Sequence, residues 1–151
     1  MSEFRIQKAL PEDAGWIAQA QVAMAKETEN LQLNQEEVVK GVKFIFDHPD
    51  RGFYIIARNN EKNPVGCLMI LKEWSDWRNG DVWWIHSLYV APDYRKHGVF
   101  RKMFEYIENF ARNSAVRGLR LFVDKSNVIA QEVYEKLGMS NDHYELFEKM
   151  F

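Results

Sequence analysis

The chain has 151 residues, of which 46% are hydrophobic and 28% charged, and its formal net charge at pH 7 is -2. This length predicts one domain with a full buried core, and the composition excludes the low-complexity and disordered classes. The nearly balanced charge gives no general attraction to nucleic acid or to an acidic membrane, so we expect neither as a partner.

The first third of the chain is predicted to form one strand and two helices. The N-terminus lacks the basic and apolar regions of a signal peptide, and no apolar run approaches about 18 residues, so we expect a cytoplasmic protein. Phe4 and Ile6 alternate with polar residues as in a strand. Apolar residues at helical spacing predict one helix from Pro11 to about Lys26 and a second over residues 34–48, separated by the acidic segment 27–30.

The middle of the chain is predicted to form antiparallel strands. Residues 53–57 and 65–71 are apolar runs on either side of a turn-rich segment, which predicts a hairpin. A third strand, residues 82–90, follows the tight-turn signal Asn79-Gly80. Cys67, the single cysteine, lies in this sheet, so the sequence excludes a disulfide framework and a multi-cysteine metal site and favours a reducing compartment.

Residues 88–103 have the order strand, basic loop and helix. The apolar strand stops at Pro92, the loop holds Gly98, and a helical pattern continues to Ala111. A helix start offers unbonded N–H groups and the positive end of the helix dipole, and glycine permits close approach of a ligand. The pattern therefore predicts an anion site, with a pyrophosphate as the first ligand to test, against the alternative of a solvated basic surface. The basic residues around it are Arg95, Lys96, His97, Arg101 and Lys102.

The last third of the chain alternates strand and helix. Residues 119–123 predict a strand, Asn127 stands at a helix start, and Gly138 stands where a C-terminal glycine belongs. Tyr144, Leu146 and Phe147 suggest a last strand. The resulting order, βααβββαβαβ, describes a single α/β domain over residues 1–151 with some parallel strands.

Two motifs carry a resemblance to a known family. Residues 95–100 read Arg-Lys-His-Gly-Val-Phe. They are similar to a six-residue motif that has Arg or Gln at its first position, Gly at its fourth, and Gly or Ala at its sixth. Residues 127–139 hold Asn127, Ala130, Tyr134 and Leu-Gly at the spacing of a second motif. Over nearly its whole length the chain thus resembles the GNAT superfamily of N-acetyltransferases. Phe100 departs from the first motif, and we interpret it as a core residue whose ring points away from the phosphates.

The resemblance implies a fold, a cofactor and a reaction. The fold is a splayed, mixed central sheet of about six to seven strands flanked by about four helices. The reaction is metal-free transfer of an acetyl group from acetyl-CoA to an amine, by direct attack in a ternary complex. The resemblance and the helix start together give a cofactor-binding set that comprises Leu88, Tyr89, Val90, Arg95, Lys96, His97, Gly98, Val99, Phe100, Arg101, Asn127 and Ala130.

Two catalytic residues are predicted. Tyr134 resembles the family's tyrosine that protonates the departing thiolate, and a phenol with a pKa near 10 holds its proton at neutral pH; the alternative is that Tyr134 only packs. The N–H of Leu88 would donate to the thioester oxygen. His86 lies two residues earlier, on what alternation predicts to be the same face as Leu88, and its neutral imidazole could accept the proton of the amine. The alternative for His86 is a hydrogen-bonded core residue.

The acceptor stays open at this level. Glu27, Glu29 and Asp76 could attract a cationic amine, or they are solvated surface. Trp84 belongs to a dense tryptophan segment that could hold an ammonium by cation–π contact, contribute to the core or form a homodimer patch. The expected acceptor is a small-molecule amine or a peptide amine. The alternatives to an enzyme are a non-catalytic acyl-CoA-binding module and a protein-interaction module on the same fold.

Overall fold

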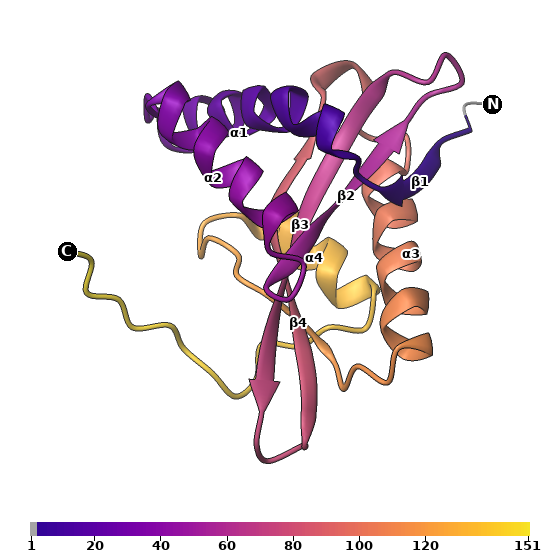
Figure 1. The fold of residues 1–151 in the computed structure, drawn as a ribbon. Coiled ribbons are helices and arrows are strands. Elements are labelled where there is room, and N and C mark those ends of the chain that lie inside the picture. The colour runs from indigo at the N-terminus through magenta and orange to yellow at the C-terminus, as the bar shows by residue number, and fades with distance from the viewer. Residues whose placement is uncertain (1–2) are drawn as a thin grey trace. The chain divides into compact units, whose positions relative to one another are not determined.

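The computed structural model describes residues 3–151 and contains one five-stranded sheet with the order β1-β2-β3-β4-β5 (Figure 1). The first four strands pair antiparallel, and β5 pairs parallel to β4. The strands are β1 (Arg5–Lys8), β2 (Gly52–Arg58), β3 (Pro64–Ser75), β4 (Gly80–Val90) and β5 (Leu119–Leu121). The helices are α1 (Ala14–Glu29), α2 (Gln35–Asp47), α3 (Val99–Asn113) and α4 (Val128–Lys136), with 3-10 turns at Pro11–Asp13 and Pro92–Tyr94. The predicted α/β class and the predicted order of elements up to α4 are confirmed.

The expected last strand is wrong. From residue 122 to residue 151 the structure has no strand, so the sheet has five strands instead of the predicted six to seven. Tyr144, Leu146 and Phe147 are 78%, 55% and 90% exposed. The alternating apolar residues of this segment are therefore exposed and do not form the buried face of a strand.

Two compact units make up the chain, the first ending at Leu121 and the second formed by Phe122–Phe151. The sheet and three of the helices, α1 to α3, belong to the first unit, and α4 belongs to the second. The single domain over residues 1–151 stays a prediction. Within residues 3–151, no helix is long and apolar enough to cross a membrane.

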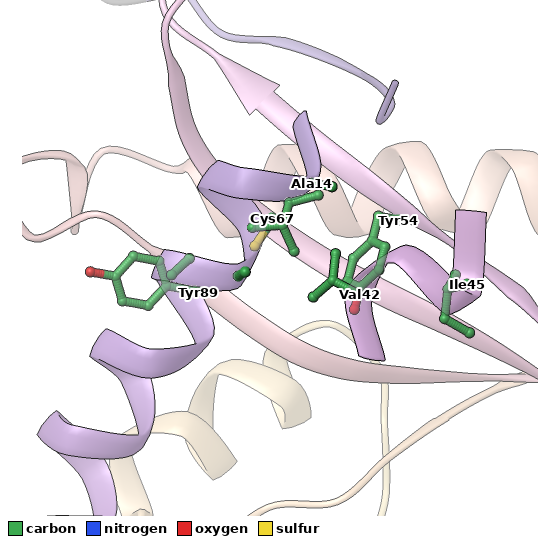
Figure 2. Close-up of a cluster of buried hydrophobic side chains, with 9 residues drawn as sticks. Ala14, Val42, Ile45, Tyr54, Cys67 and Tyr89 are labelled. Carbon is green, nitrogen blue, oxygen red and sulfur yellow. The ribbon is translucent and has the colours of Figure 1, made fainter. Parts of the chain in front are cut away.

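Helices α1 and α2 pack against the sheet through a cluster that includes Ala14, Val42, Ile45, Tyr54, Cys67 and Tyr89 (Figure 2). Ile17 and Ala18 of α1 are fully buried, and the small alanines of this helix let its backbone come close to the strands. An ion pair fixes the start of α1, since Arg58 Nη2 lies 2.7 Å from both carboxylate oxygens of the buried Asp13.

The opposite face of the sheet packs against α3. Phe53 precedes Tyr54 in β2, so the two side chains point to opposite faces. The Phe53 ring meets Trp83 and Phe110 at centroid distances of 5.2 and 5.6 Å. Val99, Met103 and Ile107 bury one stripe of α3, as its apolar spacing predicted.

Candidate functional site

A β-bulge interrupts β4 near its end. At the bulge, Leu68 of β3 lies opposite two residues of β4, Ser87 and Leu88. Ser87 has a φ of 56°, a left-handed conformation that serine rarely adopts. A bulge turns the local peptide groups away from the regular ladder, so it can aim a backbone N–H at a ligand. The flanking pairs are Met69 with His86 and Cys67 with Tyr89.

The end of β4 also has an open edge. Pairing between β4 and β5 is confined to Trp83–Ile85 of β4, so residues 86–90 have no strand on that side within residues 3–151. Leu88, Tyr89 and Val90 therefore lie on a part of the β4 edge that β5 does not cover, and their pairing with the cofactor stays a prediction. Their side chains do not determine such pairing.

Helix α3 begins directly after the loop that follows β4. Gly98 has a φ of 80°, and a Cβ atom there would meet nothing within 4 Å, so its surroundings are open. Within residues 3–151 no side chain caps the helix at Gly98, so the start of α3 presents its N–H ends without a side-chain cap. The arrangement suits an anion, since both the N–H groups and the helix dipole favour negative charge.

The basic side chains around this helix start do not all have the same role. Lys96 and His97 are exposed beside Gly98, and Arg101 is exposed and pairs with Glu105 at 3.2 Å. Arg95 instead reaches back to β4 and α1, and therefore holds the loop in place. Its contacts are Nε to the Val90 carbonyl oxygen at 2.8 Å, Nη2 to Glu27 Oε2 at 2.7 Å, and the guanidinium carbon to the Tyr89 ring centre at 5.6 Å.

A second anchor holds the same loop. The Tyr94 hydroxyl accepts a hydrogen bond of 3.0 Å from the Asn59 side-chain amide in the turn between β2 and β3. The Tyr94 ring meets Phe4 edge-on at 6.2 Å. The loop between β4 and α3 is thus tied to α1 and to the β2–β3 turn before any ligand binds.

Phe100, the departure from the first motif, is half-buried and contacts Phe104 one turn later in α3. The two ring centres are 6.0 Å apart and the planes meet at 64°. This contact agrees with a packing role for Phe100. The expectation that it packs in the core was too strong, since Phe104 is buried and Phe100 is not.

His86 does not share a face with Leu88, and this sequence prediction was wrong. Directly paired residues of antiparallel strands share a face, so His86 lies with Met69 on the α1–α2 side. The bulge shifts the alternation by one residue, which puts Leu88 on the other face. His86 is half-buried and stacks on Trp84 with ring centres 6.1 Å apart. Burial lowers the pKa of His86 from its ordinary 6.5, so the neutral imidazole prevails at neutral pH.

The residues predicted for the acceptor are spread over several elements. Glu27 is engaged by Arg95, while Glu29 at the end of α1 and Asp76 in the β3–β4 turn are exposed. Asp76 Oδ1 accepts the N–H of Trp77 at 2.9 Å, a turn contact. Trp84 is partly buried beside His86, so this pair lines the α1–α2 side of the sheet. Trp74 and Trp77, in contrast, are 62% and 88% exposed.

The second motif forms α4 and its two ends. Asn127 Oδ1 accepts the N–H of Ala130 at 3.1 Å and caps the helix. Gly138, with a φ of 89°, follows the end of the helix, so both predicted ends are confirmed. Tyr134 is half-buried, and burial raises the pKa of its phenol above 10, which keeps it protonated at neutral pH.

Residues 17–139 match the model of a family described as the acetyltransferase (GNAT) family. The chain belongs to this family. A possible acetyltransferase of known structure from Clostridium difficile 630 is 36% identical and superposes with a TM-score of 0.90, covering 98% of this chain and 97% of that one. A probable acetyltransferase of known structure is 21% identical, with a TM-score of 0.86 and 97% coverage of both chains, which shows a shared fold.

A curated relative is an uncharacterised N-acetyltransferase of Methanocaldococcus jannaschii, 28% identical over 97 residues. The match covers 64% of this chain and 42% of that protein, so this chain spans less than half of its relative's length.

The two sequence motifs coincide with the start of α3 and with α4, but three residues that support the β4–α3 region carried no local sequence signal. They are Gln21, Asn59 and Tyr94, whose partners lie far away in the sequence. Within residues 3–151, no group of three or more His, Cys, Asp or Glu side chains could hold a metal ion. A metal-free reaction stays a prediction.

Proposed function

We propose that this chain is an N-acetyltransferase that moves an acetyl group from acetyl-CoA to a primary amine, by direct attack in a ternary complex. The observation that carries the proposal is the left-handed Gly98, with open space around it, at the start of α3, one loop after the open edge of β4. These two features fit the two halves of a CoA molecule, a pyrophosphate and an amide-containing arm. Membership in the GNAT family supports the same assignment.

The cofactor would be held mainly by backbone groups. The N–H groups from Val99 to Arg101 would bind the pyrophosphate, with Lys96 and His97 adding positive charge. The edge of residues 88–90 would pair with the arm. In the second unit, Asn127 and Ala130 complete the predicted binding set by resemblance to the family motif.

When bound, acetyl-CoA supplies an activated thioester. The protein must then do three things: remove a proton from the amine, bind the developing negative charge on the acyl oxygen, and protonate the leaving thiolate. His86 suits the first task, because its lowered pKa keeps a nitrogen lone pair available at neutral pH. The Leu88 N–H suits the second, and Tyr134, with a raised pKa and a retained proton, suits the third.

The acceptor is proposed as an amine that enters from the α1–α2 side, where His86 and Trp84 lie. A small-molecule amine and a peptide amine both satisfy this chemistry. Glu29 and Asp76 are the exposed acids that could attract its positive charge, whereas Glu27 is engaged by Arg95. We also propose that the protein forms a homodimer and is located in the cytoplasm.

Thermal unfolding with and without acetyl-CoA tests the proposal first, with desulfo-CoA and ADP as comparison ligands. A ligand at 100 times its dissociation constant adds about 2.7 kcal/mol to the stability, which raises the melting temperature by several degrees. A shift with acetyl-CoA supports the enzyme and leads to a screen of amines by thiol release. Unaltered melting at millimolar acetyl-CoA contradicts it, and a shift without thiol release from any amine favours a binding module.

A further inference from the structure

Gln21 is a buried polar residue in the middle of α1, with 8% of its surface exposed. Its Nε2 donates to the carbonyl oxygen of Ser87 at 3.1 Å and lies 3.7 Å from Cys67 Sγ. The neighbouring buried positions of α1, Ile17 and Ala18, are apolar. A buried amide costs free energy unless it is hydrogen-bonded, so its bond to Ser87 explains how it is tolerated here.

The oxygen that Gln21 binds belongs to the bulge. Ser87 is the residue with a φ of 56°, and its carbonyl group shares a peptide unit with the N–H of Leu88. Residues 3–151 contain no cis peptide bond, so this peptide is trans and planar, and its C=O and N–H point in opposite directions. Fixing the Ser87 oxygen toward α1 therefore fixes the direction of the Leu88 N–H.

The same hydrogen bond also changes the strength of the donor. Donation to a peptide oxygen polarises the peptide and makes its N–H more positive, and this effect is larger in a buried site. The bond from Gln21 thus orients the Leu88 N–H and strengthens it as a donor to an anion.

We propose that Gln21 is a positioning residue that holds the Ser87–Leu88 peptide so that the Leu88 N–H meets the acyl oxygen. This role rests on the proposed function, since it requires bound acetyl-CoA. Gln21 touches neither cofactor nor acceptor in this role, and acts only through the bulge.

The experiment uses acetyl-CoA labelled with 13C at the carbonyl, bound to the full chain and observed by NMR. Gln21→Met keeps the length of the side chain and removes the donor. Cys67→Ala is the matched control, because it removes the other neighbour of the Gln21 amide and leaves Ser87 untouched. The backbone amide signal of Leu88 in the ligand-free protein gives a second readout.

In the wild type and in Cys67→Ala, the bound carbonyl signal should lie downfield of free acetyl-CoA, as hydrogen bonding to the oxygen produces. In Gln21→Met the carbonyl signal should move back toward its position in free acetyl-CoA, and the Leu88 amide signal should shift. The dissociation constant for acetyl-CoA should change by less than about twofold. With an identified acceptor, kcat should fall about tenfold or more at an unchanged KM for acetyl-CoA. If Gln21→Met does not fold, Gln21→Asn, one methylene shorter, takes its place.

A wild-type carbonyl shift that persists in the folded variant overturns the proposal, because Gln21 then only packs. Equal changes in Gln21→Met and Cys67→Ala also overturn it, since the cause would be packing around Cys67. Absence of acetyl-CoA binding by the wild type is a separate result and contradicts the proposed function itself.

Discussion

His86 is partly buried, and this burial affects its protonation. Its ring stacks on Trp84 on the α1–α2 side of the sheet. Desolvation lowers the pKa of His86, because burial removes water contacts that favour the charged imidazolium. A base with a lowered pKa is ready to accept a proton at neutral pH, although it is a weaker base than free histidine.

The lowered pKa of His86 predicts a pH-dependent stability. Below the ordinary pKa of 6.5 the unfolded chain takes up a proton at this position more readily than the folded one. The free energy of unfolding should therefore fall as the pH drops below about 6.5, and this group should contribute no slope above that value. Denaturant titrations between about pH 5 and 7 measure the slope, which His86→Gln should reduce.

The matched control is His143→Gln, since His143 is exposed. It controls for the exchange of a histidine for a glutamine at an exposed position. If stability depends on pH equally in the wild type and in His86→Gln, His86 titrates alike in the folded and the unfolded state, which contradicts the prediction.

Tyr134 is expected to act through its proton alone. Tyr134→Phe keeps the ring and removes the hydroxyl, so acetyl-CoA should bind with nearly the wild-type affinity while turnover falls by about 10²-fold or more. Because burial raises the pKa of this phenol above its ordinary value of 10, loss of the Tyr134 proton should lower wild-type turnover only at a pH above 10. Calorimetric titration measures the affinity for acetyl-CoA, and steady-state kinetics measures turnover. Unaltered turnover in Tyr134→Phe would show that Tyr134 is not the acid.

At the scale of elements, the start of α3 depends on a backbone conformation that glycine adopts readily. Gly98→Ala adds a Cβ atom that meets nothing, so its cost is the left-handed φ, about 1 kcal/mol of stability. The same strain should displace the loop and raise the dissociation constant for acetyl-CoA several-fold.

Gly138→Ala is the matched control for Gly98→Ala. Gly138 also has a left-handed φ, of 89°, with open space around it, but it follows α4 rather than preceding the anion site. Thermal unfolding should show similar losses of stability in both variants, and calorimetry should show weaker cofactor binding only in Gly98→Ala. Equal affinities would contradict the placement of the pyrophosphate.

Elements that depend on short-range contacts were predictable from the sequence. The helix caps Asn34 and Asn127 each bond a backbone N–H three residues later, and such pairs leave a readable pattern. Contacts between distant residues leave none: Gln21 and Ser87 are 66 residues apart, and Glu27 and Arg95 are 68 apart.

The bulge in β4 belongs to this second class of features. It arises from how β3 and β4 pair around Leu68, and the sequence of β4 reads as an uninterrupted strand. One extra residue reverses the faces, so the predicted direction of His86 relative to Leu88 failed even though the strand itself was predicted. The last predicted strand failed for a related reason, because alternation alone does not supply a neighbouring strand.

At the scale of the whole molecule, the two motifs fall in different compact units. Residues 95–100 belong to the unit that ends at Leu121, and residues 127–139 belong to Phe122–Phe151. Helix α3 buries a stripe of five residues, whereas no residue of α4 is buried. Amide groups of α4 should therefore open more readily than those of α3.

Hydrogen exchange with and without acetyl-CoA tests which of the predicted cofactor-binding residues the ligand protects. Saturating ligand should slow exchange in residues 88–101 and also in α4, because the predicted binding set includes Asn127 and Ala130. Helix α2 (Gln35–Asp47), which holds none of the predicted residues, is the internal control and should exchange at the same rate in both samples. Protection confined to residues 88–101 would remove Asn127 and Ala130 from the binding set.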